Sequence, residues 1–212
     1  MKILNLYAGI GGNRKLWDTL GLDIEVTAVE INPEIAKIYQ EHFPNDKVIV
    51  ADAHQYLLEH FQEYDFIWSS PPCPTHSRMR FIIQQHEGTK YKFPDMQLYE
   101  EIIFLKTWFK GKWVVENVIS YYEPLIKPFE SGNHYFWSNF NITNKKIGAR
   151  LVRRNHGDVV SRKNKWGFNL ETNNLSSKDK VFVQQIINNC VHPKLGLHIL
   201  KCAFKEKQEV LI

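Results

Sequence analysis

The stretch Lys2-Ile-Leu-Asn-Leu-Tyr-Ala-Gly-Ile-Gly-Gly12 indicates how the chain folds. Its apolar first half ends directly in the glycine-rich segment Ala8-Gly-Ile-Gly-Gly12. An apolar run followed by a glycine turn is typical of a strand that leads into a helix. Glycines permit tight backbone geometry and close approach of a ligand, and a helix amino terminus favours negative groups. The stretch therefore predicts a strand, a ligand-binding turn and a helix.

The same alternation of strand, loop and helix continues toward residue 118. Four further apolar runs predict strands, at residues 24–30, 47–50, 64–68 and 112–115. Helices are predicted from Asn32-Pro33 to about residue 43 and over 94–110, with a loop at 74–93 between strand and helix. Repetition of this unit predicts an α/β fold, with a mostly parallel sheet and helices on both faces.

Beyond residue 118 the pattern changes. Residues 134–142 favour a strand, residues 143–178 show little periodicity, and 179–201 favour helix with an interruption near His192-Pro193. Residues 144–165 carry eight basic side chains and one acidic one, a net charge of +7, which leaves −3 on the rest of the chain. Such a block indicates either a polyanionic partner or a solvated loop.

Groups able to bind a ligand follow the ends of the predicted strands: Gly9, Gly11, Glu30, Asp52, Cys73 and Glu116. Ligands of parallel sheets bind at this carboxyl edge. Glu30 can accept hydrogen bonds from ribose hydroxyls, and Asp52 can accept one from an adenine amino group or cap a helix. Arg14 occupies the position of the third glycine in a dinucleotide fingerprint. The set indicates a nucleoside-type ligand.

Cys73 is the candidate nucleophile. It lies in Ser70-Pro-Pro-Cys-Pro-Thr-His-Ser77, where two prolines stiffen the backbone before it. A free thiol has a pKa of about 8.5, so reactivity needs local positive charge or backbone amides, and Arg78 and Arg80 are close in sequence. Glu116, after an apolar strand, can act as an acid, as a hydrogen-bonding clamp or as a structural ion-pair partner.

The composition of the 212 residues, 43% of them hydrophobic, provides one full core. No apolar run reaches the ~18 residues of a membrane helix, and the start is not typical of a signal peptide. Three widely spaced cysteines cannot all pair, which favours a reducing compartment. The spacing of Cys190, His192, His198 and Cys202 does not fit the usual zinc sites, so we predict no metal. We expect a cytoplasmic protein, in a bacterial cell or a phage-infected host.

The order of these motifs resembles that of the DNA cytosine-5 methyltransferases. The motifs that carry the resemblance are Tyr7–Gly12, Glu30, Asp52, Pro71-Pro-Cys73 with Ser77, Glu116-Asn-Val118, and Gln185–Pro193. The last is similar to the family's closing Gly-Asn-x-Val motif, with Asn188 in place of glycine. The resemblance implies a Rossmann-like fold that uses S-adenosyl-L-methionine and methylates carbon 5 of cytosine in double-stranded DNA. Cys73 would add to carbon 6 of a base flipped out of the duplex.

The resemblance also implies roles for individual residues. The cofactor pocket would be lined by Tyr7, Ala8, Gly9, Gly11, Gly12, Glu30, Ile31, Asp52, Ala53 and Asn189. Glu30 would hold the ribose and Asp52 the adenine, with Ile31 and Ala53 flanking the ring, and Asn189 would contact the cofactor or the loop beside the first glycine turn. Glu116 would contact the cytosine ring nitrogen and amino group. DNA contacts would come from Ser77, Arg78, Arg80, Arg150, Arg153 and Arg154. Residues 141–180 would form a small basic recognition region, and 1–140 with 181–212 the catalytic domain.

One family motif is missing. The family has Gln-x-Arg-x-Arg in a strand after Glu-Asn-Val, and one of its arginines contacts the base oxygen. Here His134, Arg150 or Arg153 are the candidates to replace it. The short recognition region favours a short target site.

Two other functions stay open at this stage. One is a cytosine-5 methyltransferase of RNA, because a related branch modifies tRNA, and Trp166 and Phe168 could serve as stacking faces. The other is a non-catalytic DNA-binding homologue, which the intact Cys73 and Glu116 disfavour. The sequence also leaves open the oligomeric state and the biological role, whether beside a cognate restriction enzyme, in phage self-protection or in regulation.

Overall fold

The computed structural model describes residues 1–86, 88, 90–144, 167–168, 170 and 177–204. Within them, seven strands form one sheet in the order β3-β2-β1-β4-β5-β7-β6. The parallel strands are β1 Lys2–Leu6, β2 Glu25–Glu30, β3 Lys47–Val50, β4 Phe66–Ser69 and β5 Lys112–Val118. An antiparallel pair, β6 Phe129–Ser131 and β7 His134–Ser138, continues the sheet beyond β5. The predicted Rossmann-like, mostly parallel sheet is confirmed.

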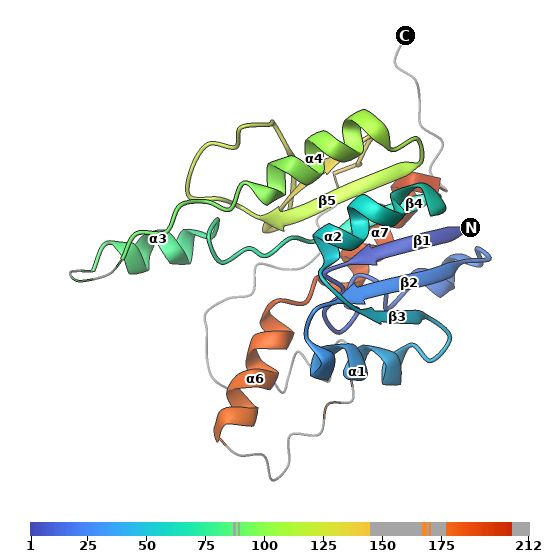
Figure 1. The fold of residues 1–212 in the computed structure, drawn as a ribbon, viewed down its shortest axis with the longest axis horizontal. Helices are drawn as coiled ribbons and strands as arrows, with labels where there is room; N and C mark the ends of the chain where they lie inside the picture. Colours follow the sequence, from blue (N-terminus) through green and yellow to red (C-terminus); the bar gives the residue numbers. More distant parts are fainter. Residues whose placement is uncertain (87, 89, 145–166, 169, 171–176, 205–212) are drawn as a thin grey trace.

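Helices cover both faces of this sheet (Figure 1). They are α1 Pro33–His42, α2 Ala53–His60, α3 Arg78–Gln84, α4 Gln97–Trp108, α6 Ser177–Asn188 and α7 Pro193–Phe204, with short 3₁₀ helices at Trp17–Leu20 and Phe61–Glu63. The break expected near His192-Pro193 separates α6 from α7. None of the described helices combines the length and apolarity that crossing a bilayer requires.

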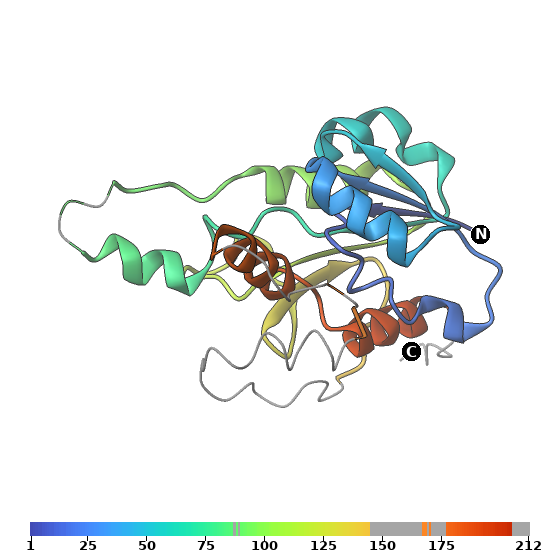
Figure 2. The ribbon, with the colours of Figure 1, turned by 90° about the horizontal axis from the view of Figure 1, so that it is seen from below.

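The apolar strands divide their side chains between two cores. Ile3 and Leu4 are neighbours in β1 but belong to opposite faces, because successive strand residues alternate. The core on one face includes α2 and α4, and the core on the other includes α7. A third cluster joins α1 and α6 beside the glycine turn. Helix α3 and the segment after it extend away from the sheet in both views (Figure 1 and Figure 2).

The prediction of a helix directly after the glycine turn is wrong. The chain instead makes successive turns and then the 3₁₀ helix Trp17–Leu20. Gly9 and Gly11 have φ angles of 54° and 80°, which no right-handed helix contains. The side chain of Asn13 donates a hydrogen bond to Asn5 Oδ1 at 2.7 Å and so holds the turn against β1. The sequence prediction also missed α3, which lies within the expected loop 74–93, and strand β6.

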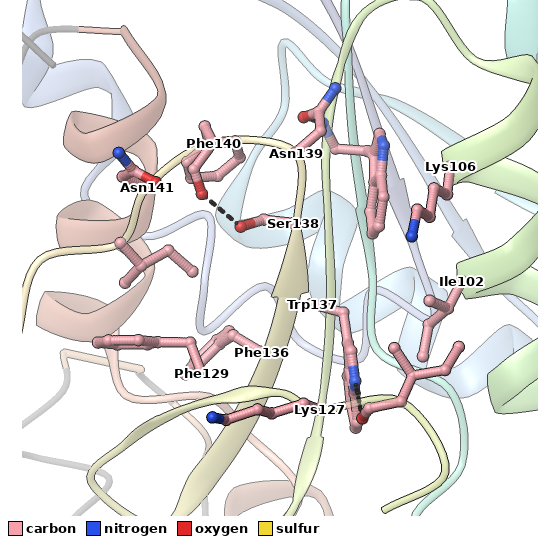
Figure 3. A pocket seen from close by; sticks show the side chains of 13 residues that line it. Ile102, Lys106, Lys127, Phe129, Phe136, Trp137, Ser138, Asn139, Phe140 and Asn141 are labelled. Carbon is pink, nitrogen blue, oxygen red and sulfur yellow. Dashed lines mark hydrogen bonds between the residues drawn. The ribbon is translucent and has the colours of Figure 1, made fainter. Parts of the chain in front are cut away.

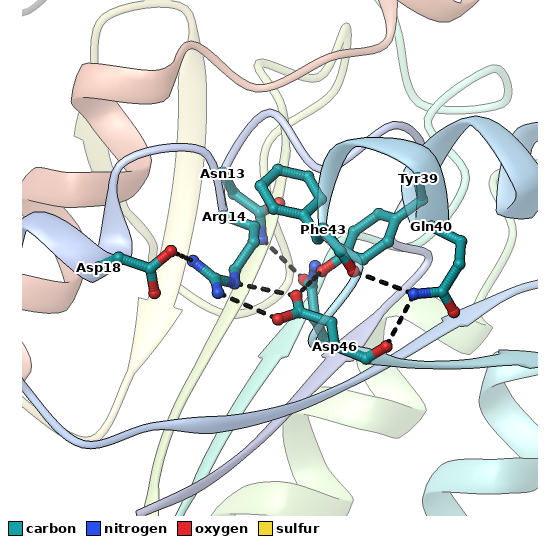
Figure 4. Close-up of polar contacts among 8 residues, drawn as sticks. Asn13, Arg14, Asp18, Tyr39, Gln40, Phe43 and Asp46 are labelled. Atoms are coloured by element: carbon teal, nitrogen blue, oxygen red, sulfur yellow. Dashed lines mark hydrogen bonds and ion pairs between the residues drawn. The ribbon is translucent and has the colours of Figure 1, made fainter.

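Arg14 anchors this irregular segment (Figure 4). Its buried guanidinium donates to both carboxylate oxygens of Asp46, at 2.9 and 3.0 Å, and pairs with Asp18 at 2.9 Å. Tyr39 donates its hydroxyl to the same Asp46 carboxylate at 2.8 Å, and the guanidinium lies 5.2 Å from the ring centre of Phe43. The network ties the glycine turn to the connection between α1 and β3.

Breaking this network should cost stability. Arg14→Met leaves the carboxylate of Asp46 buried without its cation, which costs about 3–5 kcal/mol of unfolding free energy. Asp18→Asn is the matched control, because Asp18 is 68% exposed and its ion pair is worth about 0–1 kcal/mol. Denaturant unfolding measures both variants. Equal, small effects of the two substitutions would contradict the role given to Arg14.

Candidate active site

The carboxyl edge of the sheet brings the predicted site residues to one region. Strand β1 lies between β2 and β4. The chain adds β2 and β3 on one side of β1 and then crosses to add β4 and β5 on the other, so the strand order reverses at β1. The crevice outside such a switch point is the usual ligand site of an open α/β sheet. Glu30 is the last residue of β2, and Glu116 lies near the end of β5. The segments that leave β1, β3 and β4 at the same edge carry Gly9, Asp52 and Cys73.

Glu30 shapes the glycine turn. Its two carboxylate oxygens accept hydrogen bonds from the backbone N–H groups of Gly9 and Asn32, each at 3.0 Å. A carboxylate has about four acceptor positions, so two such bonds leave capacity for ribose hydroxyls. Ile31, the next residue, is 66% exposed, as a side chain that flanks a bound ring requires.

The three glycines of the turn have different surroundings. A Cβ atom at Gly9 would meet no atom within 4 Å, so this position is open to a ligand. A Cβ at Gly11 would lie 2.3 Å from Phe43, and one at Gly12 would lie 2.1 Å from the sulfur of Cys190. The glycines at 11 and 12 are therefore required by packing within the protein. The contact with Cys190 also places the segment after α6, which begins with Asn189, against the glycine turn.

Asp52 and Ala53 begin helix α2. Asp52 Oδ1 accepts a hydrogen bond from the backbone N–H of Gln55 at 2.9 Å, so this carboxylate is the N-cap that the sequence offered as its structural role. Ala53 is buried in the core that α2 shares with α4, so a contact with a bound ring would involve its backbone. Binding of adenine here stays a prediction.

A buried carboxylate that sequence reasoning missed connects the segment after β1, the end of β4 and helix α2. Glu101 in α4 is fully buried and accepts hydrogen bonds from the hydroxyls of Tyr7 and Ser69, both at 2.5 Å. His54 in α2 lies 3.2 Å from the same carboxylate. The hydrogen bond that His54 donates to Glu101 raises the pKa of His54, against the opposing effect of burial. The sequence could have indicated this role, because Glu101 is an acidic residue next to Ile102, on the apolar face of the predicted helix 94–110.

Cys73 is a half-buried free thiol in a rigid turn. Its carbonyl accepts the backbone N–H groups of His76 and Ser77 at 3.0 and 3.1 Å. The side chain of Asn117, which follows Glu116, donates to the carbonyl of Pro71 at 3.0 Å. The Pro-Pro-Cys and Glu-Asn-Val segments are thus held together by direct hydrogen bonds.

The pKa of the Cys73 thiol is shifted upward, opposite to the expected lowering. Burial raises the pKa of the thiol, and the negative charge of Glu116 raises it further. Arg78, exposed at the start of α3, is not among the described groups that act on the pKa of Cys73, and the side chain of Arg80 lies outside the described residues. Without a substrate, Cys73 therefore rests as a neutral thiol at neutral pH.

Glu116 is paired with His134. Strands β5 and β7 are antiparallel, with Glu116 opposite Phe136 and Val118 opposite His134. Nδ1 of His134 lies 2.5 Å from Oε1 of Glu116, whose side chain is only 8% exposed. Of the three residues considered as replacements for the family's arginine, His134 is the one that the structure places beside Glu116. Arg150 and Arg153 lie outside the described residues.

The predicted nucleic-acid contacts are only partly described. Ser77 lies at the end of the Cys73 turn and bridges to Ser120, and Arg78 follows it. The other predicted contacts lie outside the described residues: the side chain of Arg80, the whole of Arg154, most of the basic block 144–165 and most of the proposed recognition region 141–180.

The exposure of the aromatic side chains also differs from the expectation that Phe168 could stack on bases. Phe168 is 1% exposed, so it is not a stacking face, and its ring lies 4.9 Å from the ammonium of Lys15. Tyr91 and Phe93, in the segment after α3, are 79% and 88% exposed. Sequence reasoning passed over these two residues.

A cavity of about 470 Å³ lies elsewhere (Figure 3). It is lined by residues of α4, by Trp113 at the start of β5, and by Trp137 and Ser138 at the end of β7. Ser138 pairs with Val114, near the beginning of β5, but Phe136, which also lines the cavity, pairs with Glu116. The cavity therefore extends along β7.

The chain is similar in sequence to several known methyltransferases. An 80-residue stretch is 38% identical to the tRNA (cytosine(38)-C(5))-methyltransferase of Spodoptera frugiperda, a match that covers 36% of this chain and 24% of that protein. The chain thus matches about a quarter of that relative's length. A mutant of Spodoptera frugiperda DNMT2 aligns with 29% identity over 55% of this chain and 35% of that one, with a TM-score of 0.39. A putative DNA modification methyltransferase from an E. coli prophage aligns with 16% identity over 70% and 52% of the two chains, with a TM-score of 0.44. The C-5 cytosine-specific DNA methylase family matches residues 1–119, more than half of the 212 residues, and the chain belongs to this family.

Proposed function

We propose that this protein transfers a methyl group from S-adenosyl-L-methionine to carbon 5 of cytosine in double-stranded DNA. The observation that carries the proposal is the pairing of two segments at one sheet edge. Cys73 follows β4, Glu116 lies near the carboxyl end of the adjacent β5, and the hydrogen bond between Asn117 and Pro71 joins the two segments. A nucleophile and a hydrogen-bonding acid on neighbouring strands are what addition to a pyrimidine ring requires.

The residues beside this pair fit the cofactor. Gly9 leaves open space above the turn, Glu30 retains acceptor capacity for ribose, and Ile31 offers an exposed apolar side chain. The cofactor supplies an electrophilic methyl group. The protein's part is to hold that group beside the base and to make carbon 5 reactive.

The reaction follows from the ring's chemistry. Carbon 5 of cytosine is a weak nucleophile until the sulfur of Cys73 bonds to carbon 6 and pushes an electron pair toward carbon 5. Glu116 stabilises the charge that gathers on the ring nitrogen. After methylation a base removes the proton on carbon 5, and the thiolate leaves. The sulfur of Cys73, the carboxyl group of Glu116 and the methyl donor can all reach the same cytosine only after it has left the base stack. Flipping the base out costs a few kcal/mol.

RNA is the second candidate substrate. The relative that is 38% identical over 80 residues is a tRNA methyltransferase by name. Exposed Tyr91 and Phe93, next to Lys90 and Lys92, form an aromatic and basic surface after α3. Unpaired bases stack on such aromatic faces, which favours RNA loops over a closed duplex.

One experiment separates these substrates. The protein is incubated with labelled S-adenosyl-L-methionine and either double-stranded DNA or tRNA, and the modified nucleoside is identified by mass spectrometry. We expect 5-methylcytosine in DNA. Label in RNA alone would favour the second candidate, and label on the cytosine amino group would contradict both.

The basic block gives a prediction for DNA affinity. Changing Arg150, Arg153 and Arg154 together to Gln should weaken binding and reduce the slope of log K against log salt by about 3, because each phosphate contact contributes about one. The control changes three exposed lysines elsewhere to Gln: Lys37, Lys106 and Lys110. Binding curves at several salt concentrations measure both. Identical slopes in the two triple variants would place DNA recognition elsewhere.

A further inference from the structure

We infer that His134 is the positioning residue for Glu116, and that the two side chains act as one proton-holding pair during the methyl transfer. The inference rests on the proposed function and adds to it a residue and a source for the proton. It assigns a role to a histidine that stands in the strand next to Glu116, where the family has an arginine-containing motif.

The geometry of the pair is fixed by the sheet. His134 begins β7 and lies opposite Val118 of β5, so the ladder between the two strands sets its position relative to Glu116. Nδ1 lies 2.5 Å from Oε1, a short, charge-assisted distance. The Glu116 side chain is 8% exposed and that of His134 is 25% exposed. A carboxylate this buried needs a partner, and His134 provides it.

The charges around His134 favour the protonated ring. Burial alone lowers the pKa of His134, but the charge and hydrogen bond of Glu116 outweigh burial, and the net shift is upward. From β7 itself the ring of Phe136 faces the imidazole at 6.2 Å. From β6 the partner in the ladder is Ser131, which carries no charge, and beyond Glu116 lies the Cys73 thiol. Glu116 is thus the charged group that acts on His134 within the described residues.

A pair with one shared proton solves a problem of the reaction. Glu116 must present a proton to the ring nitrogen when sulfur adds to carbon 6, yet as a carboxylate it has none. Transfer of the proton from Nδ1 to the carboxylate leaves both groups neutral, and rotation of the carboxyl group points its O–H at the ring. When the thiolate leaves, the ring nitrogen no longer needs this hydrogen bond and the proton returns to His134. No proton is gained or lost by the pair over the cycle.

The same cation also acts on the nucleophile. The charge of Glu116 raises the pKa of Cys73, so a positive partner on Glu116 reduces that effect. A neutral His134 would leave the carboxylate uncompensated and make the thiol harder to ionise. Activity should therefore fall as the pH rises through the pKa of His134, even though a higher pH by itself favours the thiolate.

His134→Asn tests the inference. Asparagine places an N–H near the position of Nδ1 but cannot carry an exchangeable positive charge. We expect kcat for methyl transfer to fall by about 10²-fold, with little change in KM for nucleic acid or in cofactor binding. The alkaline limb of the pH–rate profile should disappear in the variant. His60→Asn is the matched control, because His60 forms a similar 2.7 Å pair with Glu63 on the surface of the protein.

A wild-type kcat and an unchanged alkaline limb in His134→Asn would overturn the inference. A second measurement uses NMR titration of the His134 ring in the wild-type protein and in Glu116→Gln, and does not depend on folding of the histidine variant. The pKa of His134 should be lower in Glu116→Gln, and an unchanged value would overturn the pairing. A wild-type protein that methylates carbon 5 in neither DNA nor RNA would overturn the proposed function, while the titration reports separately on the pair.

Discussion

Cys73→Ala is expected to lower the rate of methyl transfer by more than about 10⁴-fold, because loss of a nucleophile removes the step on which the others depend. Binding of S-adenosyl-L-methionine should be unchanged, since the pocket predicted for it is built around Gly9 and Glu30 and not around the thiol. Incorporation of labelled methyl groups measures the first effect, and calorimetry measures the second.

The control for this variant is Cys202→Ala. Cys202 is a buried thiol of α7, in the core on one face of the sheet, and takes no part in the proposed reaction. It should retain methyl transfer. Turnover by Cys73→Ala comparable to that of the control would contradict the assignment of the nucleophile.

Glu116→Gln is expected to have two opposite effects. Methyl transfer should fall by about 10²–10⁴-fold, because an amide cannot serve as the acid. The pKa of the Cys73 thiol should fall at the same time, because the negative charge that raises it is removed. Below the wild-type pKa the thiolate fraction of the variant is then larger, so simple alkylation of Cys73 becomes faster while catalysis becomes slower.

Rates of iodoacetamide alkylation across a pH series, followed by peptide mass spectrometry, give the pKa of Cys73 in each protein. Parallel labelled-methyl assays give the catalytic loss. An alkylation profile identical to that of the wild type, together with full methyl transfer, would show that Glu116 neither acts on Cys73 nor takes part in the reaction.

Local patterns predicted the parallel sheet well, because each strand is a short apolar run between loops and helices. The predicted run 47–50 coincides with β3, and the predicted helix 94–110 contains α4, Gln97–Trp108. The helix after the glycine turn was wrong because contacts distant in sequence decide it. Arg14 is held by Asp46, 32 positions away, and Gly12 lies against Cys190.

The site was predictable where it depends on strand ends and less so where it depends on neighbouring strands. Glu30 and Glu116 lie near the carboxyl ends of β2 and β5, and Gly9 and Cys73 follow β1 and β4, so all four are at the expected edge, while their roles stay predictions. The pairing of Glu116 with His134 depends on the register of an antiparallel strand, which the sequence does not reveal. The direction of the pKa shift at Cys73 likewise comes from burial and from a charge on another strand.

The most direct test of the covalent mechanism uses DNA that carries 5-fluorocytosine at a proven target site, together with the protein and S-adenosyl-L-methionine. Fluorine on carbon 5 cannot be removed as a proton is, so the sulfur–carbon bond to the base should persist after the methyl transfer. Intact-mass measurement should then show the protein joined to the methylated oligonucleotide, with Cys73 as the modified residue after digestion. Free protein and free oligonucleotide alone, under conditions in which the unfluorinated DNA is methylated, would contradict covalent addition by Cys73.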